Sequence, residues 1–259
     1  MHTSALFDLA GKTALVTGGG HGIGRHLSIG LAEAGADVMV TGRKPEPLDE
    51  VVAAIEAIGR RAWALRADLS DTQQIDDLLD SAKRLAPRLD VLVNNAGMVW
   101  TAPTLDYPMD GWDKVFDLNV RGLFYLSQQV GRQMRDSGGG SIVNISSISA
   151  WRCAPDDVEP VVAYNASKGA VVSLTRDMAV KLAEFNIRVN GIAPGPFLTD
   201  MMNHLRHDEE ILRTFESNIP QRRSGTEDDI KGVVVFLAGP ASAYMTGQTV
   251  VVDGGWSCT

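Results

Sequence analysis

Short apolar runs alternate with longer helical patterns from one end of the chain to the other. The apolar runs are continuous, as in "KTALVTG" and "DVMVTGR", and do not alternate with polar residues. Strands covered by helices on both faces have this composition, which is typical of a parallel sheet. The predicted strands are residues 12–18, 37–43, 62–70, 89–97, 140–147, 187–195 and 249–253.

Helical patterns separate these runs. The predicted helices are residues 22–35, 47–59, 71–85, 112–134, 164–185 and 226–238. Ser70 and Gln73 resemble a capping box at the start of the third helix. Because strand and helix alternate without a proline- and serine-rich linker, we expect a single α/β domain over residues 1–259. Its fold would be doubly wound and Rossmann-type, with a seven-stranded parallel sheet between helix layers and ligands bound at the carboxyl ends of the strands.

The composition suits a domain with a sizeable core, since 22% of the 259 residues are charged and 44% are hydrophobic. The formal net charge of −8 gives no reason to expect nucleic acid or a membrane surface as a partner. Residues 232–252 carry no charge, but Pro240 interrupts them, so we expect a helix end, a turn and a strand rather than a membrane helix. Cys153 and Cys258 show neither metal spacing nor a disulfide pattern, and the first residues do not resemble a signal peptide. A cytoplasmic location is therefore expected.

A glycine-rich turn, "TGGGHGIG", follows the first strand. Gly18 permits a tight turn, Gly22 lets the backbone approach a pyrophosphate, and Gly24 lets the helix pack close to the strand. The amino end of the next helix would then face phosphates with free N–H groups and a favourable dipole. The spacing is G-x-x-x-G-x-G, and a merely structural turn is the alternative. His21 either assists at the phosphate or faces solvent.

The end of the second strand bears on the choice of cofactor. NAD-specific sites place a carboxylate here for the ribose 2′-hydroxyl, but this chain has Gly42, Arg43 and Lys44. Asp37 is acidic but lies at the beginning of the strand, on the wrong side of the sheet. Gly42 leaves room and Arg43 could pair with a 2′-phosphate, which predicts NADP(H) over NAD(H). The alternative is that the two cations form a solvated turn.

Polar residues also follow the third and fourth strands. Asp68 is placed either to accept a hydrogen bond from an adenine amino group or to begin the next helix. Asn94 and Asn95 begin "NNAG", which suits a tight turn whose amides brace neighbouring strands and meet a cofactor ribose. Later in the chain, Tyr164 and Lys168 are four residues apart in a helical pattern, so both side chains lie on one face. Taken alone, that pair could be a phenol packed on a lysine stem.

Together these motifs resemble the short-chain dehydrogenase/reductase family over essentially the whole chain. The matching positions, in order, are Thr17 to Gly24, Asn94 to Gly97, Asn119, Ser147, Tyr164 with Lys168, and Pro194 with Gly195. The resemblance implies hydride transfer between a nicotinamide and a substrate carbon, while a proton moves between Tyr164 and the substrate oxygen. A free phenol has a pKa of about 10. The Lys168 ammonium would favour the phenolate and bond the nicotinamide ribose.

The resemblance also implies roles for the remaining site residues. Ser147 would donate to the substrate oxygen, whereas Ser146 would point the other way along its strand. Asn119 would hold a water that links Lys168 to solvent, with an ordinary buried amide as the alternative. The implied catalytic residues are Asn119, Ser147, Tyr164 and Lys168. The implied cofactor-binding residues are Thr17, Gly18, Gly20, His21, Gly22, Ile23, Gly24, Arg43, Asp68, Leu69, Asn95, Ala96, Gly97, Tyr164, Lys168, Pro194, Gly195, Phe197 and Thr199.

Two segments should shape the substrate side. Residues 200–224 would form a substrate lid. Its polar residues His204, His207, Asp208 and Glu209 look like metal ligands, but we favour solvated charges because hydride transfer needs no metal. The sixteen residues between Ser147 and Tyr164 are more than many family members have, and this excursion carries Trp151, Arg152, Asp156, Asp157 and Glu159.

The sequence therefore predicts an NADP(H)-linked alcohol dehydrogenase or carbonyl reductase. "DYPMDGWDKV" and "AYMTGQ" resemble 3-oxoacyl thioester reductases, including those linked to rhamnolipid synthesis, so 3-oxoacyl compounds rank slightly ahead as substrates. Sugar-acid or polyol dehydrogenases are the alternative within the family. A regulator that senses NADP without chemistry is the alternative from another class, and the intact Ser147, Tyr164 and Lys168 argue against it. The resemblance further implies a homotetramer or homodimer built through the two long central helices.

Overall fold

Seven parallel strands form one sheet in the order β3-β2-β1-β4-β5-β6-β7 in the computed structural model, which describes residues 2–198 and 209–259. The strands are β1 Thr13–Thr17, β2 Asp37–Gly42, β3 Ala62–Arg66, β4 Val91–Asn94, β5 Gly140–Ile145, β6 Ile187–Pro194 and β7 Thr249–Val252. All seven predicted strands and the predicted fold class are confirmed. Strands β1, β2, β4, β5 and β6 are almost entirely buried and rich in Val, Ile, Leu and Ala, as strands between two helix layers require.

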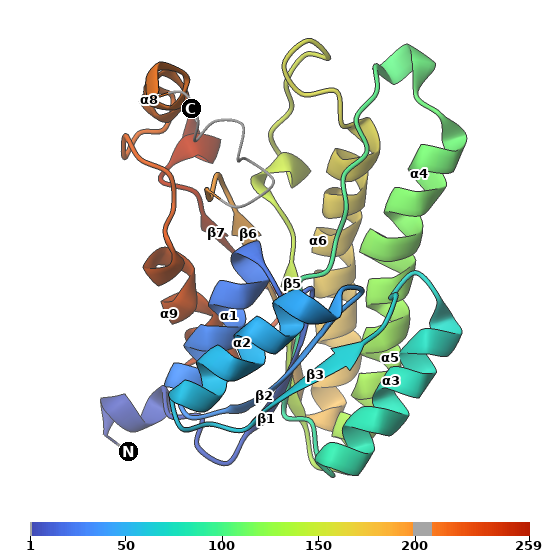
Figure 1. Cartoon of the computed structure of the whole chain (residues 1–259), viewed down its shortest axis with the longest axis vertical. Coiled ribbons are helices and arrows are strands. Elements are labelled where there is room, and N and C mark those ends of the chain that lie inside the picture. The colour runs from blue at the N-terminus through green and yellow to red at the C-terminus, as the bar shows by residue number, and fades with distance from the viewer. Residues whose placement is uncertain (1, 199–208) are drawn as a thin grey trace.

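Helices cover both faces of the sheet (Figure 1). They are α1 Gly22–Glu33, α2 Pro45–Ala57, α3 Thr72–Leu85, α4 Met109–Phe116, α5 Leu123–Asp136, α6 Val162–Leu182, α8 Glu209–Ser217 and α9 Glu227–Ala238. One apolar cluster joins α1, α2 and α9 to the sheet, and a second joins α3, α5 and α6 to its other face. The strand order reverses where β1 pairs with both β2 and β4, and the connections diverge there to leave a crevice above the carboxyl ends.

The predicted helix over residues 112–134 is interrupted. Between α4 and α5 lies a π-helical turn, Asp117–Gly122. A side chain at Gly122 would collide with the carbonyl oxygen of Leu69, so the turn passes directly against the connection that follows β3. Turns of this kind are rare and are frequent at functional sites. Helical periodicity alone could not reveal this interruption.

Three further local outcomes bear on the sequence analysis. The predicted cap at Ser70 is wrong by one residue, because Asp71 accepts the hydrogen bond from the Gln73 N–H (2.9 Å) and caps α3. Helix α8 was not predicted within the proposed lid. Residues 232–252 form the end of α9, a short turn at Pro240–Ser242 and β7, as predicted. Across the described ranges, no helix combines the length and apolar character needed to cross a bilayer.

Candidate active site

A cleft of about 610 Å³ opens above the carboxyl ends of β1, β4 and β5, where the strand order reverses. Most of the residues predicted for the cofactor and for catalysis line it. The lining residues are Gly18, His21, Gly22, Ile23, Gly24, Gly42, Arg43, Ala67, Asp68, Leu69, Asn95, Ala96, Gly97, Leu118, Ile145, Ser146, Ser147, Tyr164, Lys168, Pro194, Gly195 and Phe197. The fold thus brings strand-end residues from along the whole chain to one place.

The glycine-rich turn presents bare backbone to this cleft. Gly18 and Gly22 have φ of 60° and 51°, a conformation that side chains rarely tolerate. A side chain at Gly24 would collide with the carbonyl oxygen of Gly18. His21 precedes α1 and makes no side-chain cap, so its side chain leaves the first N–H groups of α1 open to a ligand. A backbone cradle at a helix amino end fits a pyrophosphate.

The turn after β4 is tied to the turn after β1. Asn95 donates from Nδ2 to the carbonyl oxygens of Thr17 (2.9 Å) and Gly18 (3.1 Å). The hydroxyl of Thr17 accepts from the N–H groups of Asn95 and Ala96, both at 2.9 Å. Asn94 braces the sheet instead, since its Nδ2 donates to Asn144 Oδ1 (2.9 Å) and Ser127 Oγ (2.8 Å). Hydrogen bonds therefore hold the turns after β1 and β4 together at the floor of the cleft.

The residues that bear on cofactor choice lie as the sequence analysis expects. A side chain at Gly42 would meet only a methyl group of Leu48 at 3.5 Å, so space is open beside it. Arg43 is exposed at the rim of the cleft. Asp37 lies at the opposite edge and pairs with Arg60 (2.8 Å) and Arg61 (2.6 Å). It is thereby excluded as the ribose carboxylate.

Asp68 holds the chain ahead of the next helix, and its side chain also borders the cleft. Its Oδ1 accepts from the N–H (3.0 Å) and the hydroxyl (2.7 Å) of Ser70, which organises the start of the next helix. Asp68 also lines the cleft, where a ligand amino group could reach it.

Two of the predicted cofactor residues that the structure describes do not line the cleft. Thr17 lies beneath it, holding the β4 turn. Gly20 faces α2, where a side chain would come within 3.1 Å of Pro47. Thr199 lies outside the described residues. Conversely, the sequence analysis missed three residues that line the cleft, Ala67, Leu118 and Ile145. The available signals were that Ala67 and Ile145 lie at strand ends and that Leu118 precedes Asn119.

Tyr164 and Lys168 share one face of α6, and Ser147 faces them from the end of β5. Ser147 lies close enough to Tyr164 to oppose the rise in the pKa of its phenol. The Lys168 ammonium lies 5.5 Å from the centre of the Tyr164 ring and donates to the carbonyl oxygen of Ile145 (2.9 Å). Ser146 points away, and its hydroxyl donates to the Lys168 carbonyl oxygen (2.9 Å). The geometry thus separates the two serines in the way that strand alternation predicts.

Burial dominates the electrostatics of the pair. Desolvation raises the pKa of Tyr164; the neighbouring Ser147 hydroxyl opposes that rise, and the charge of Glu159 adds to it. Burial also lowers the pKa of Lys168 to about 8. The ammonium donates to the Ile145 carbonyl, and a positive charge this close to a phenol favours the phenolate.

Asn119 projects from the π-helical turn and bonds two neighbouring segments. Its Oδ1 accepts from the Met98 N–H (2.8 Å), and its Nδ2 donates to the Met98 carbonyl (2.9 Å) and to Ser167 Oγ (3.0 Å). The side chain therefore braces the segment after β4 against α6. Both amide hydrogens are used, whereas Oδ1 keeps a second acceptor position for a water. Gly97 separates Asn119 from Lys168, because a side chain there would lie 3.3 Å from Asn119 Oδ1 and 3.5 Å from Lys168 Nζ.

The excursion between Ser147 and Tyr164, predicted to shape the substrate side, is fastened to neighbouring segments. Asp156 fastens it to the segment after β4, accepting from the Thr104 N–H (2.9 Å) and hydroxyl (2.8 Å). Arg152 stacks over Trp256 at 4.5 Å, and Trp256 meets Phe215 of α8 edge to face at 5.2 Å. The excursion, the carboxyl-terminal residues and α8 are therefore in contact.

Part of the predicted lid cannot be compared with the sequence analysis. His204, His207 and Asp208 lie outside the described residues, and Glu209 is the first residue of α8.

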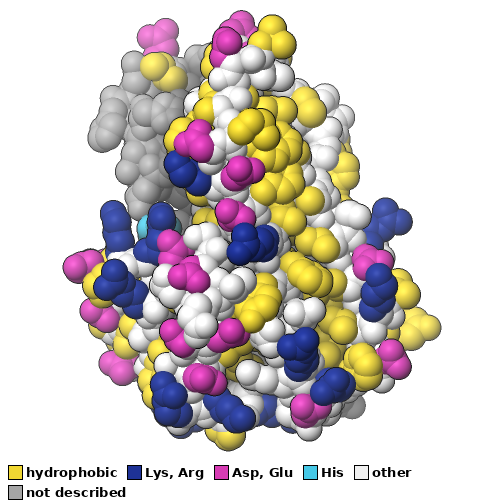
Figure 2. All heavy atoms as spheres, turned by 90° about the vertical axis from the view of Figure 1, so that its right-hand side faces the viewer, with side chains coloured by type: hydrophobic (Ala, Val, Ile, Leu, Met, Phe, Trp, Pro, Cys, Tyr) yellow, Lys and Arg dark blue, Asp and Glu magenta, His cyan; other side chains and the backbone are white. Residues whose placement is uncertain are grey.

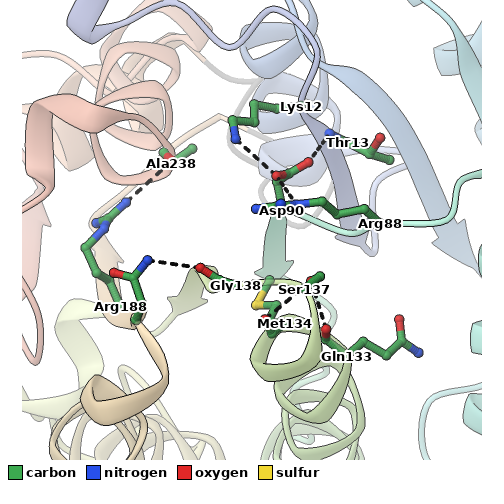
Figure 3. Close-up of polar contacts among 11 residues, drawn as sticks. Lys12, Thr13, Arg88, Asp90, Gln133, Met134, Ser137, Gly138, Arg188 and Ala238 are labelled. Atoms are coloured by element: carbon green, nitrogen blue, oxygen red, sulfur yellow. Dashed lines mark hydrogen bonds and ion pairs between the residues drawn. The ribbon is translucent and has the colours of Figure 1, made fainter.

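A second cleft, of about 250 Å³, lies at the opposite edge of the sheet (Figure 3). The charged side chains that line it all form ion pairs or hydrogen bonds within the protein. Asp90 accepts from Lys12 (3.1 Å), Arg88 (2.7 Å) and the Thr13 N–H (3.0 Å). Arg188 donates to the last carbonyl oxygens of α9, including that of Leu237 (2.9 Å). Cations at helix carboxyl ends stabilise the fold by opposing the helix dipole. This cleft is structural.

Known proteins resemble this chain over nearly its whole length. A family profile described as "Enoyl-(Acyl carrier protein) reductase" matches residues 18–257. The chain is 39% identical to 2-dehydro-3-deoxy-D-gluconate 5-dehydrogenase of Dickeya dadantii, covering 96% of this chain and 97% of that one. It is 38% identical to the rhamnolipids biosynthesis 3-oxoacyl-[acyl-carrier-protein] reductase of Pseudomonas aeruginosa, covering 96% and 98%. The crystal structure of a gluconate 5-dehydrogenase from Burkholderia cenocepacia, in complex with NADP and tartrate, superposes with a TM-score of 0.92 at 34% identity and covers 100% of both chains.

Proposed function

The chain belongs to the short-chain dehydrogenase/reductase family, and from that premise we propose a reaction in which Tyr164 is the acid–base residue and NADP(H) is the preferred hydride carrier. The protein is an oxidoreductase that acts on CH–OH groups, as its relatives do. The observation that carries the proposed mechanism is the meeting of Ser147, Tyr164 and Lys168 at the inner end of the cleft.

The chain's own residues hold the substrate and move its proton. Ser147 donates a hydrogen bond to the substrate oxygen and so fixes it beside the Tyr164 hydroxyl. In the oxidising direction Tyr164 takes the hydroxyl proton, and in the reducing direction it returns one. When bound, the nicotinamide would exchange a hydride with the substrate carbon, and in its oxidised form its positive charge would favour the phenolate. Lys168, held at the Ile145 carbonyl and close to Gly97, could donate a further hydrogen bond to a ribose hydroxyl of the bound cofactor.

Replacing Tyr164 by Phe tests this mechanism. We expect NADPH oxidation with a panel of ketones, sugar acids and 3-oxoacyl thioesters to fall by about 1,000-fold or more, because general acid–base catalysis is lost. Binding of NADPH, followed by its fluorescence, should be kept. Tight cofactor binding by the wild type without turnover of any carbonyl or alcohol would instead support an NADP-sensing regulator.

The preference for NADP(H) is supported by Arg43, by the open space at Gly42 and by the absence of a carboxylate at the end of β2. Arg43→Ala should raise the KM for NADPH about tenfold and leave that for NADH unchanged, because only the 2′-phosphate contact is lost. Lys44→Ala is the neighbouring control. A wild type that prefers NADH would contradict the proposal.

The relatives include enzymes named for three substrate classes, which are sugar acids, 3-oxoacyl thioesters and hydroxysteroids, and the sequence analysis favours the first two. Both present a CH–OH or carbonyl carbon to the same catalytic group, so the Tyr164 geometry does not choose between them. The choice depends on the residues of the excursion.

We also propose that the protein is a homodimer or homotetramer that associates through α4, α5 and α6. Figure 2 shows hydrophobic side chains gathered over the α4 and α5 face. Met109 is 66% exposed and Phe124 is 41% exposed, and these are apolar side chains that association would cover. Molar mass by light scattering, for wild type and Phe124→Asp, tests the assembly.

A cytoplasmic location is supported by the two free, exposed cysteines, Cys153 and Cys258.

A further inference from the structure

We propose that Glu159 determines the substrate class: its carboxylate accepts a hydrogen bond from a hydroxyl group next to the reacting carbon, so the enzyme acts on polyhydroxylated compounds. This inference rests on the proposed function, because it concerns a second contact made by the same substrate.

The excursion is folded so that one of its acidic residues faces the catalytic group. Asp156 is used to fasten the excursion to Thr104, and Asp157 is exposed. The Val158 and Glu159 N–H groups both donate to the Pro155 carbonyl (2.9 Å), which makes a tight turn. The Pro160 carbonyl then accepts from the Ala102 N–H (3.0 Å) and closes the base of the excursion. Glu159 is left half-buried on the inner side of this turn.

A short chain of hydroxyl groups connects Glu159 to the reacting position. The Ser149 hydroxyl donates to Glu159 Oε1 at 3.5 Å. The Ser147 hydroxyl oxygen lies 3.1 Å from the Ser149 hydroxyl oxygen. Ser147 and Tyr164 line the same cleft, and Ser147 lies close enough to influence the pKa of the Tyr164 phenol. The carboxylate is also close enough for its charge to raise the pKa of the Tyr164 phenol. A substrate whose oxygen lies between Ser147 and Tyr164 would therefore present its neighbouring carbon to Glu159.

Glu159 has unused capacity to accept hydrogen bonds. Within residues 2–198 and 209–259, its recorded side-chain partner is Ser149, at the limit of hydrogen-bond length, and no Lys or Arg forms an ion pair with it. A carboxylate has about four acceptor positions, and a half-buried one is stabilised by any donor that reaches it. A hydroxyl next to the reacting carbon supplies such a donor.

The same carboxylate disfavours the other substrate class. A 3-oxoacyl thioester has no hydroxyl beside its keto carbon and would bring an apolar chain against Glu159. Sites built to bond a substrate hydroxyl discriminate strongly against analogues that lack it, because the buried polar group loses its partner. When the reacting hydroxyl of a sugar acid is several bonds from its carboxylate, that carboxylate can stay away from Glu159.

Matched variants at Glu159 test the inference. Wild type, Glu159→Gln and Glu159→Leu are assayed with D-gluconate, D-glucitol, 2-butanol and a 3-hydroxybutyryl thioester, with NADP as the oxidant. Wild type should oxidise at least one of the polyhydroxylated compounds with the highest kcat/KM of the panel. Because a hydrogen bond to a charged group is lost, Glu159→Gln should lower that kcat/KM about tenfold and Glu159→Leu about 100-fold. With 2-butanol neither variant should lower kcat/KM, because no hydrogen bond is lost and removal of the Glu159 charge favours the phenolate of Tyr164.

The control is Asp157→Asn, which alters an exposed acid of the same excursion and should leave the whole panel unchanged. Unchanged NADPH affinity shows that a variant is folded, and if Glu159→Leu is not, the ratio for Glu159→Gln decides. Equal losses on all substrates, no losses, or a wild type that prefers the thioester would overturn the role of Glu159 while leaving the proposed reaction standing. No turnover of any compound by the wild type would overturn the proposed reaction, and the role of Glu159 with it.

Discussion

The two sides of the cleft are built by different means. On the cofactor side, Gly24 packs directly against the Gly18 carbonyl and the Asn95 amide, which are bonded to each other. A Cβ atom at Gly24 would overlap with both groups. On the substrate side, the excursion from Ile148 to Pro160 is held by a few side-chain contacts, such as that of Asp156 to Thr104. Steric constraints on the backbone allow one residue type, whereas a hydrogen-bonded loop can be rebuilt from many. The first side can therefore serve a shared cofactor while the second is free to choose a substrate.

The largest effect is expected from an added methyl group on the cofactor side. Gly24→Ala places its Cβ against the Gly18 carbonyl and the Asn95 amide, neither of which can move without opening the turn. We expect a loss of about 3 kcal/mol in the free energy of unfolding and at least 100-fold weaker NADPH binding. Urea unfolding and fluorescence titration measure the two quantities.

Gly232→Ala is the matched control for that variant. Gly232 is an exposed residue of α9, and a Cβ there meets nothing within 4 Å. Alanine favours a helix over glycine, so the control should be stabilised by about 0.5–1 kcal/mol. Equal tolerance at Gly24 and Gly232 would contradict a sterically fixed cofactor side.

An intermediate effect is expected at Lys168, where the two sides meet. Its folded-state pKa of about 8 lies below the ordinary value of 10.5, so between these pH values the folded chain has released a proton that the unfolded chain keeps. Stability from this group therefore rises with pH across that window and is constant below it. Relative to Lys168→Met, the wild type should gain up to about 3 kcal/mol between pH 8 and pH 10.5.

Urea unfolding of both proteins at several pH values measures this difference, and other titrating groups cancel in the comparison. Parallel stability curves for the two proteins would show that Lys168 remains charged despite its burial.

The smallest effect is expected on the substrate side. Asp156→Ala removes two exposed hydrogen bonds to Thr104 and should cost less than about 1 kcal/mol of stability. Because the excursion loosens, the KM for substrate should rise a few-fold while the NADPH affinity stays unchanged. Asp157→Ala, at an exposed neighbour, should change neither quantity. A large fall in NADPH affinity for Asp156→Ala would show that the two sides are coupled.

The same contrast explains how far the sequence could predict the structure. Continuous apolar runs predicted every strand, and the glycine spacing with the Tyr164 and Lys168 pair predicted where the cleft would form. The bond from Lys168 to the Ile145 carbonyl has no signature, because any residue could supply that oxygen. The partners of Asn119 depend on a change of helix type that periodicity averages away. The orientation of Glu159 depends on the path of a loop, which only the folded chain defines.

The π-helical turn at Asp117–Gly122 also keeps a long helix in phase with what it packs against. The buried positions from α4 to α5 include Gly111, Val115, Asn119, Gly122, Leu126, Val130 and Met134. From the first to the last, 23 residues are covered in six steps, or about 3.8 per step, whereas an α-helix repeats every 3.6. A regular helix with this stripe would drift progressively around its axis and turn its apolar side toward water before its end. One wide turn absorbs the excess, so a single-residue deletion there would rotate all of α5 without changing any of its side chains.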